Sequence, residues 1–426
     1  PIGKTGKSVV RTGVLYGANA AGKSNLVRAM SFAQRMIGRE RSNKVSNVET
    51  FRFCESTVPR PSTFEFQFLI DESVYVYGFD VSAKDIQEEW LTVVRDGNEQ
   101  VIFERKGKHK PTIGDKRAAG SDAHEILHKV TSLPLRSDQL LLNRVLSLPE
   151  EVQGKSLRAV IKWLTHDLVV LRPDHRALDI LDRIARDPEF KTFATLFMQS
   201  VGTGIGGFEI QEAERAANDI ERQFLSRVSN APPNWFGDAF GRAGERDLRL
   251  KADDPSVVID RRLLSSHTTD AGNVSLPFGE ESDGTQQLLH LIPVLASPSD
   301  GGRVVVLDEL DRSLHPILCW EFIRFFSESC PGAPRQLVVT THEAHLLNQD
   351  LLRRDEYWFV EKDKRQQSRL VPLSDFNVRN DFKAERGYLQ GRFGAIPIIG
   401  SMSALEELLQ NRLKTEGGNA TQAPSA

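Results

Sequence analysis

The sequence predicts an α/β fold with three parts: a core built on a parallel sheet, an antiparallel β subdomain and a mostly helical insertion. Two stretches that lie far apart in the chain predict the core. Residues 13–16 form a short apolar run that leads through a glycine-rich loop into a helical pattern, and residues 303–341 alternate apolar strands with one helix. Because alternating strands and helices are typical of parallel sheets, we expect both stretches to contribute to one sheet.

The glycine-rich loop lies in GVLYGANAAGKSNL, residues 13–26, and fits the pattern G-x-x-x-x-G-K-[ST] between a strand and a helix. In a phosphate-binding loop, backbone N–H groups and the positive end of the helix dipole bind the phosphates. Lys23 would reach the β- and γ-phosphates, and the Ser24 hydroxyl would ligate Mg²⁺. The alternative is a glycine-rich turn before an ordinary helix. The expected nucleotide-binding residues here are Gly17, Asn19, Ala20, Ala21, Gly22, Lys23, Ser24 and Asn25.

Four strand-like runs follow the first helix. Residues 62–70, 73–81, 88–94 and 99–105 are rich in alternating polar and apolar side chains, and Asp96-Gly97 joins the last two. This alternation between tight turns predicts an antiparallel meander. We assign the meander, with the phosphate-binding loop, to an N-terminal part of the core that comprises residues 1–122.

Residues 123–275 are expected to form the mostly helical insertion. Helical spacing of apolar residues runs from about 123 to 199, for example at 157–164 and 177–185. The glycine-rich run 202–210 interrupts it, a further helix is predicted at 213–228, and residues 229–275 have little regular pattern.

The C-terminal part of the core comprises residues 276–413. Strands are predicted at 303–310, 336–341 and 356–361, and a helix at 315–329. The tail 414–426 lacks apolar periodicity, so we expect it to be disordered.

Bulk composition is that of a soluble globular protein, with 39% hydrophobic and 27% charged residues. A formal net charge of −3 gives no global argument for nucleic-acid binding. Three cysteines, none in a C-x-x-C pair, indicate a reducing compartment and argue against structural zinc. No apolar run is long enough to span a membrane and no signal peptide is visible, so we expect a cytoplasmic protein. The chain begins at Pro1 rather than at a methionine, and we expect residues upstream of it.

Two acids follow the apolar part of the strand predicted at 303–310. At the carboxyl edge of a parallel sheet, such acids lie beside a bound phosphate. Asp308 would hold Mg²⁺, directly or through water, and Glu309 would orient or deprotonate the attacking water. The alternative is that the acids merely end the strand.

A second helix start lies in ESDGTQQLLHLIPVL, residues 281–295. Ser282 and Gly284 stand at its N-terminus, where anions bind, although a capped helix is the ordinary interpretation of this run. Within one subunit, the first loop would already bind the γ-phosphate of the nucleotide and leave little access for a second helix start. We therefore expect two subunits to pair head-to-tail, each contributing this element to the nucleotide of the other.

Two more residues are candidates near the terminal phosphate. His342 lies just past the strand predicted at 336–341 and could contact the γ-phosphate, whereas a structural histidine is the alternative. Asp311, in DELDRSLHP, would line the seam between two subunits.

The order phosphate loop, S-D-G-T-Q, LDELDRSLHP and TTHEAHLL resembles the ABC-type ATPases, the group that includes the SMC and OLD proteins. YGANAAGKSNL, DGTQQLL, DELDRSLHP and YLQGRFGAIP (388–397) are also similar to the AAA-family ATP-binding proteins of abortive-infection, or anti-phage, systems. The resemblance covers nearly the whole chain and is weakest over 106–275. It implies an ABC-ATPase-like nucleotide-binding core, ATP and Mg²⁺ as cofactors, and a homodimer or higher homo-oligomer. The implied catalytic residues are Lys23, Glu309 and His342.

The chain departs from the ABC pattern at two points. Asp283 stands at the first glycine of the signature L-S-G-G-Q, and Thr285 stands at the second. The glutamine that reaches Mg²⁺ after the first helix has no clear counterpart, and Gln67 is a weak candidate.

OLD nucleases also carry a C-terminal Toprim domain with an acidic metal-binding set. After Glu361 this chain has only a short strand, a loop and YLQGRFGAIP, and it has neither a Cys/His metal cluster nor a nucleophile elbow. We therefore expect ATP hydrolysis as its only chemistry, used to sense phage infection and to control a separate toxic effector such as a nuclease.

The run ERKGKHKPTIGDKR, residues 104–117, has six basic and two acidic side chains, a balance of +4. A solvated loop is the ordinary interpretation, and contact with nucleic-acid phosphates or an acidic partner is the alternative.

Two other functions stay open at this point. One is a DNA-maintenance ATPase of the RecF or SMC type, although the long heptad arms of SMC proteins are missing. The other is a scaffold that ATP holds together without hydrolysis.

Overall fold

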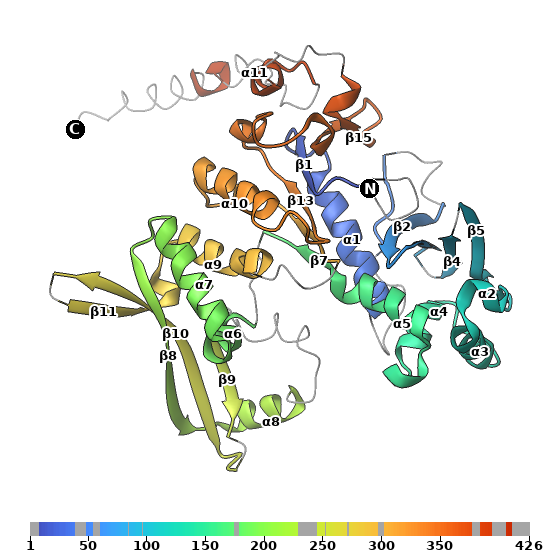
Figure 1. Ribbon diagram of the computed structural model, residues 1–426, viewed down its shortest axis with the longest axis horizontal. Helices are drawn as coiled ribbons and strands as arrows, with labels where there is room; N and C mark the ends of the chain where they lie inside the picture. Colours follow the sequence, from blue (N-terminus) through green and yellow to red (C-terminus); the bar gives the residue numbers. More distant parts are fainter. Residues whose placement is uncertain are drawn as a thin grey trace, which may run out of the picture.

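The central sheet joins strands from both ends of the chain. The structure, a computed structural model, describes residues 8–38, 48–53, 60–83, 85–95, 97–173, 179–228, 245–251, 253–270, 272–296, 302–376, 384–393 and 406–410. Six strands lie in the order β15-β14-β1-β13-β12-β7, and all pair in parallel except β15, which runs antiparallel to β14. The predicted parallel sheet, split between the two ends of the chain, is confirmed (Figure 1). Its strands are β1 (Thr12–Gly17), β7 (Leu168–Leu171), β12 (Val304–Leu307), β13 (Gln336–Thr340), β14 (Tyr357–Lys362) and β15 (Ser368–Pro372).

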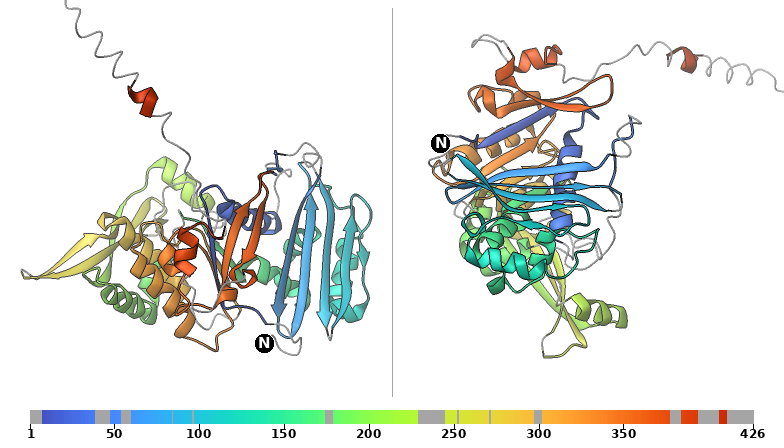
Figure 2. Two further views of the ribbon diagram at one scale, coloured as in Figure 1. Left: turned by 90° about the horizontal axis from the view of Figure 1, so that it is seen from above. Right: turned by 90° about the vertical axis from the view of Figure 1, so that its right-hand side faces the viewer.

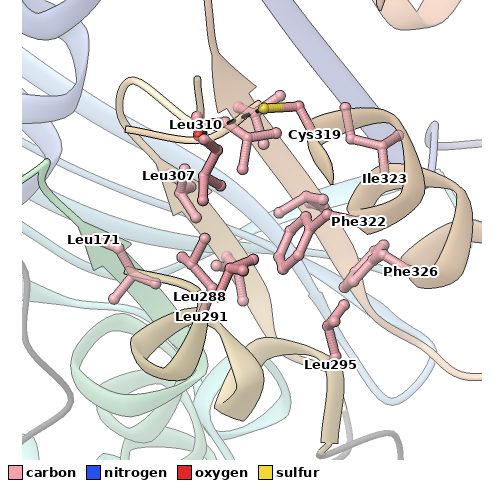
Figure 3. Packing of buried hydrophobic residues seen from close by; sticks show 14 of the residues in the cluster. Leu171, Leu288, Leu291, Leu295, Leu307, Leu310, Cys319, Phe322, Ile323 and Phe326 are labelled. Carbon is pink, nitrogen blue, oxygen red and sulfur yellow. Dashed lines mark hydrogen bonds between the residues drawn. The ribbon is translucent and has the colours of Figure 1, made fainter. Parts of the chain in front are cut away.

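Helices cover both faces of this sheet. On one face, α9 (Asp283–Ala296) and α10 (Pro316–Glu328) bury leucines and phenylalanines against β7 and β12 (Figure 3). On the other face, α1 (Lys23–Gly38) contributes Val27, Ala33 and Ile37 to a second apolar cluster with Val306. Neighbouring residues of β12 thus point to opposite clusters, as the pleat of a strand requires. Each fully buried leucine or phenylalanine stabilises the fold by about 1.5–3 kcal/mol.

The start of α10 shows how the sequence sets a helix boundary after the acidic strand. The His315 side chain accepts a hydrogen bond from the Ile317 N–H at 3.3 Å. Pro316 occupies the first helical position, where a missing N–H costs nothing and the fixed φ favours the helix. The helix predicted at 315–329 is observed one residue shorter at each end.

The predicted meander is present as a five-stranded antiparallel sheet. Its order is β2-β3-β4-β5-β6, and the four predicted strands agree with the observed ones to within two residues. Short helices pack on it (Figure 2) and share its apolar cluster. The Phe68 and Trp163 rings stack at 4.0 Å between centroids. The elements are β2 (Ser62–Ile70), β3 (Ser73–Val81), β4 (Ile86–Arg95), β5 (Asn98–Lys106), β6 (Thr112–Ile113), α2 (Lys116–Ala119), α3 (Ser121–Val130), α4 (Leu141–Leu146) and α5 (Lys155–Lys162).

The insertion is less helical than the sequence pattern predicts. The helices expected up to residue 199 are present, but β7 interrupts them and joins the central sheet beside β12. Residues 229–275 were expected to lack regular structure, yet their described part consists largely of three strands that belong to a four-stranded antiparallel sheet. The elements after β7 are α6 (Ile180–Arg186), α7 (Pro188–Ser200), β8 (Ile205–Ala216), α8 (Asp219–Val228), β9 (Arg246–Leu250), β10 (Val257–Thr269) and β11 (Gly272–Pro277).

The helix predicted at 213–228 begins only at Asp219. Residues up to Ala216 extend β8 instead, because β8 pairs with β10 along its length. Ion pairs across the strands, including Arg261 to Glu212 at 2.9 Å and Lys251 to Glu214 at 2.9 Å, involve side chains that a helix would also tolerate. Strand pairing therefore decided a segment whose local pattern is helical.

The remaining elements are short helices and single helical turns. The tail predicted to be disordered, 414–426, lies outside the described residues. Among the described helices, none is both long and apolar enough to cross a membrane. The division into 1–122, 123–275 and 276–413 stays a prediction. The remaining elements are η2 (Glu150–Val152), the π-helical η3 (Trp163–Asp167), η5 (Phe278–Glu280), η6 (Ala344–Leu346), η7 (Arg354–Glu356), η8 (Leu373–Asp375) and α11 (Ala384–Leu389).

A buried carboxylate ties the meander to its helices. Glu89 of β4 is fully buried, and it accepts hydrogen bonds from the N–H groups of Leu141 at 2.6 Å and Leu142 at 3.2 Å, at the start of α4. The Tyr77 hydroxyl donates a third, at 3.1 Å. Burial raises the pKa of Glu89, whereas these hydrogen bonds and the Arg105 guanidinium act in the opposite direction.

We predict that Glu89→Ala lowers the free energy of unfolding by about 3–5 kcal/mol, because Arg105 would stay buried without its counter-charge. Urea unfolding followed by circular dichroism measures the change. Glu125→Ala, on the exposed side of α3, is the matched control and should change stability by less than about 0.5 kcal/mol. Equal unfolding midpoints for the two variants would contradict this role of Glu89.

Candidate functional site

The predicted phosphate-binding loop lies between the end of β1 and the start of α1. Ala20 and Gly22 have φ angles of 62° and 113°, so the turn uses left-handed backbone. Glycine adopts this conformation freely and other residues rarely do. The side chains of Asn19, Ala20 and Asn25 are exposed to solvent, whereas Ala21 is buried beneath the turn.

The two glycines of the motif are also required by packing. A Cβ atom on Gly17 would lie 2.9 Å from the carbonyl oxygen of Val360, on β14. A Cβ atom on Gly22 would lie 2.4 Å from the Ser368 hydroxyl, on β15. The C-terminal hairpin β14–β15 therefore presses against the loop from outside.

Lys23 is the buried cation of this loop, with 6% of its side chain exposed. Its Nζ donates hydrogen bonds to the carbonyl oxygens of Gly17 at 2.7 Å and Ala18 at 3.3 Å. Burial lowers the pKa of Lys23. Three nearby carboxylates oppose this shift by favouring the ammonium form: Asp311, Asp308 and Glu309.

The two predicted acids lie beside the loop. Asp308 is 5% exposed, and its Oδ1 accepts hydrogen bonds from the Ser24 hydroxyl at 3.3 Å and from the Thr340 hydroxyl at 2.5 Å. The Thr340 oxygen accepts in turn from the Glu309 N–H at 2.8 Å. Glu309 has a φ of 55°, a conformation that non-glycine residues rarely adopt and that is common at functional sites.

The donor atoms of this cluster suit Mg²⁺. The ion prefers hard oxygen ligands, and in nucleotide sites it takes one or two from the protein and others from phosphates and water. The Ser24 hydroxyl and the Asp308 carboxylate supply such oxygens 3.3 Å apart. Over the described ranges, no three His, Cys, Asp or Glu side chains form a group that could hold a metal ion.

Asp311 and His342 are brought together next to the acids. The backbone N–H of His342 lies 3.3 Å from both carboxylate oxygens of Asp311. The His342 side chain remains exposed. Its pKa is lowered by partial desolvation and by the charge of Lys23, so the neutral imidazole is favoured. Asp311 thus anchors the loop that carries His342. The sequence pattern placed Asp311 at the seam between two subunits and did not predict this contact within one subunit.

Ser282 and Gly284 lie at the start of α9. The Ser282 hydroxyl accepts a hydrogen bond from the Thr285 N–H at 3.2 Å and so caps the helix. A Cβ atom on Gly284 would lie 2.6 Å from the Ser313 carbonyl oxygen, which explains the glycine and places α9 against the turn after the acids. Within the described residues, Ser282 forms no hydrogen bond with the phosphate-binding loop.

Several contributors to the site have no signal in the sequence. The Ser368 hydroxyl donates to the Ala21 carbonyl oxygen at 2.6 Å, and Lys362 Nζ donates to that of Ala20 at 3.2 Å. Both residues come from the β14–β15 hairpin. Thr340, at the end of β13, could have been suspected, because it ends the strand next to the acidic one.

The run 104–117 presents fewer free positive charges at the surface than its sequence suggests. Arg105 is only 2% exposed and donates to the backbone carbonyl groups of Arg136 at 2.9 Å and Gln139 at 2.5 Å. Lys106 pairs with Glu104 at 3.0 Å. Arg105 is therefore a structural residue, and a nucleic-acid contact of this run stays a prediction for its other cations.

Gln67 is exposed on β2, and its amide donates to Glu65 at 3.3 Å. No hydrogen bond in the described part of the chain joins it to Ser24 or Asp308. A magnesium-binding role for Gln67 therefore has no support from its contacts.

Fold and site together are those of an ATPase-type core: a parallel sheet with the predicted phosphate-binding loop after β1 and acids after β12. A family model described as "AAA domain, putative AbiEii toxin, Type IV TA system" matches residues 14–348. The chain belongs to this AAA-domain family.

Two solved structures are similar to the chain at low identity. One is described as the SmcHead bound to the C-winged helix domain of ScpA, with 12% identity, coverage of 85% of this chain and 90% of that chain, and a TM-score of 0.35. The other is an SMC head domain from Thermotoga maritima, with 16% identity, coverage of 84% and 89%, and a TM-score of 0.31. A comparison with curated proteins finds no match.

We predict that Gly22→Ala weakens ATP binding at least about tenfold, because the new methyl group would displace Ser368 and distort the loop. Titration calorimetry with ATP and Mg²⁺ measures the affinity. Gly97→Ala is the matched control, since Gly97 also has a positive φ, of 80°, but has nothing within 4 Å of the new Cβ. An unchanged affinity in Gly22→Ala would show that the hairpin does not constrain the loop.

Proposed function

We propose that the chain binds and hydrolyses ATP with Mg²⁺ and acts as a nucleotide-driven dimerising switch in phage defence. In this role it senses infection and controls a separate toxic effector, a nuclease. One observation carries the enzymatic part: Ser24 of the loop and Asp308 after β12 meet at 3.3 Å, with Lys23 buried beside them.

Each residue has a distinct role in this proposal. Ser24 and Asp308 would hold Mg²⁺, which would neutralise phosphate charge when bound. Lys23 offers a buried ammonium to the β- and γ-phosphates. Glu309 orients or deprotonates the attacking water, and its backbone is held in place by Thr340. His342, in its neutral form, contacts the γ-phosphate.

Hydrolysis is proposed to need two subunits. The Ser282 hydroxyl and the start of α9 are exposed to solvent, and their hydrogen bonds remain local. A helix N-terminus attracts anions, so this exposed end suits a phosphate on another molecule. Head-to-tail pairing would bring Ser282 and Gly284 of each subunit to the nucleotide of the other, and Asp311 would lie at the seam.

The separate effector follows from the chemistry of the site. The cluster of Lys23, Ser24 and Asp308 suits phosphate chemistry, and no metal-binding group of three His, Cys, Asp or Glu side chains occurs among the described residues. A conformational change driven by ATP is useful only if a recipient binds the two states with different affinity. The family description, which names a putative toxin and a toxin–antitoxin system, supports a role in defence.

We predict that Glu309→Gln keeps ATP binding but slows hydrolysis by about a hundredfold or more, because charge neutralisation survives while water activation is lost. The variant should accumulate as an ATP-bound dimer, detectable by light scattering with and without ATP. Wild-type specific activity should rise with protein concentration.

Adding Ser282→Arg to Glu309→Gln is the matched control, and it should prevent the dimer while lowering the free energy of unfolding by only about 1 kcal/mol, the cost of losing the Ser282 cap. Normal turnover by Glu309→Gln would remove Glu309 from its proposed role. If the specific activity of the wild-type protein does not change with its concentration, hydrolysis does not require the dimer.

We further predict that expression of the chain alone is harmless, and that Lys23→Ala abolishes phage defence in the complete system. The effector should co-purify with Glu309→Gln and Lys23→Ala to different extents, because ATP state would decide whether it is held or released. Plating efficiency of phage and quantitative pull-downs measure these outcomes. DNA or RNA degradation, or toxicity, by the isolated chain would contradict a two-component system.

A further inference from the structure

Tyr16, the residue before the first glycine of the phosphate-binding loop, is fully buried, and its hydroxyl has no hydrogen-bond partner among the described residues. Its ring packs edge-on against Tyr388 of α11, in the run YLQGRFGAIP, at 5.4 Å between centroids. The rings of Tyr357 and Phe359 on β14 lie 6.3 Å and 6.1 Å away. An unsatisfied buried hydroxyl costs free energy, and phenylalanine would fill the same space without that cost. Packing alone therefore does not explain a tyrosine at this position.

The neighbouring Tyr357 shows how a tyrosine hydroxyl can be used at this place. Its hydroxyl donates to the carbonyl oxygens of Leu346 at 2.9 Å and Asn348 at 2.6 Å. Both belong to residues 341–348, which we call the His342 loop. The tyrosine on β14 is thus paired, and it fixes the far end of the His342 loop.

The strand β1 reaches the near end of the same loop. The Leu15 carbonyl oxygen accepts a hydrogen bond from the Thr341 N–H at 3.1 Å, and Tyr16 follows Leu15 directly. Burial raises the pKa of Tyr16 well above its usual value, and the charges of Glu343 and Asp311 add to this rise. The hydroxyl therefore stays protonated, and it can donate to a carboxylate.

Of these two carboxylates, Glu343 is the better acceptor for a further hydrogen bond. Both oxygens of Asp311 already lie 3.3 Å from the His342 N–H. The Oε1 atom of Glu343 accepts from the His345 N–H at 3.1 Å, and a carboxylate can accept several donors. Glu343 is also bonded directly to His342 in the chain, so a shift of one carries the other with it.

We propose that Tyr16 is a positioning residue for ATP hydrolysis. When His342 contacts the γ-phosphate, its loop shifts, and the Tyr16 hydroxyl donates to the Glu343 carboxylate and holds His342 in that position. This inference rests on the proposed function, because it requires ATP in the phosphate-binding loop and His342 at the γ-phosphate. A hydrogen bond that forms only in the reacting state accelerates turnover and does not stabilise the fold.

The variant Tyr16→Phe separates this role from packing, because it removes the hydroxyl and keeps the ring. It should lower kcat for ATP about tenfold, the effect of one hydrogen bond lost from the reacting state, and change ADP affinity by less than about twofold. Its melting temperature should equal that of the wild type or rise by about 1–3 °C, because an unpaired hydroxyl has been removed. Steady-state kinetics at one fixed protein concentration, titration calorimetry with ADP and thermal unfolding measure the three quantities.

Tyr77→Phe is the matched control, because Tyr77 is also fully buried but its hydroxyl is paired with Glu89 at 3.1 Å. It should lower the melting temperature and leave kcat unchanged. The acceptor is tested by a double-mutant cycle. In a Glu343→Ala background, Tyr16→Phe should change kcat by less than about twofold, because the hydroxyl has already lost its partner.

Wild-type kcat in Tyr16→Phe would overturn the inference. A lower melting temperature of this variant would overturn it too, since the hydroxyl would then be paired without ATP. A full tenfold loss in the Glu343→Ala background would show that Glu343 is not the acceptor, against the proposal. If the wild-type chain hydrolyses no ATP, the proposed function itself is wrong, and the inference falls with it.

Discussion

The Asp308 carboxylate holds the site together. One of its oxygens accepts hydrogen bonds from Ser24 at the start of α1 and from Thr340 at the end of β13, so three segments meet at one atom. The same Thr340 hydroxyl binds the N–H of Glu309 and supports its left-handed backbone. These contacts require the register in which Leu307 pairs with Val339, because a slip of one residue would turn every side chain of the strand to the opposite face.

Packing around the central sheet protects that register. The apolar clusters on its two faces include alternate residues of β12, and α9 and α10 cover one of them (Figure 3). The close approach of Gly284 to the Ser313 carbonyl group links the start of α9 to the turn that follows the acids. The exposed helix start, where subunits are proposed to meet, therefore lies directly against the turn that follows the acids.

The C-terminal hairpin closes the loop from the other side. Its contacts at Gly17 and Gly22 leave no room for a side chain, and its hydroxyl and ammonium groups bind loop carbonyl groups of Ala21 and Ala20. The motif is thus held between Asp308, which follows β12 and bonds to Ser24, on one side and groups from β14 and β15 on the other. This double support gives the loop a fixed shape.

Local sequence patterns were sufficient for the parts of this protein that depend on neighbouring residues. The spacing of Gly17, Gly22, Lys23 and Ser24 predicted a strand, loop and helix, because these residues act within one turn of chain. The meander was predictable for the same reason, since alternation and short turns are local. The split of the parallel sheet followed from the alternation of strands and helices at both ends.

Only the tertiary structure decided what depends on pairing between distant segments. The apolar run of β7 is only four residues long, so its sequence pattern cannot be distinguished from that of the helices around it. Pairing with β12 gives it a strand conformation. Pairing with β10 likewise overrode the helical pattern at the end of β8. Lys362 and Ser368 reach the loop from strands more than 300 residues away in sequence, and Thr340 reaches Asp308 from the next strand of the sheet; no spacing within the chain encodes such contacts. The sequence also counted Arg105 among the cations of a basic run, but in the structure its side chain is buried. Burial depends on what packs over a residue, which a local pattern does not show.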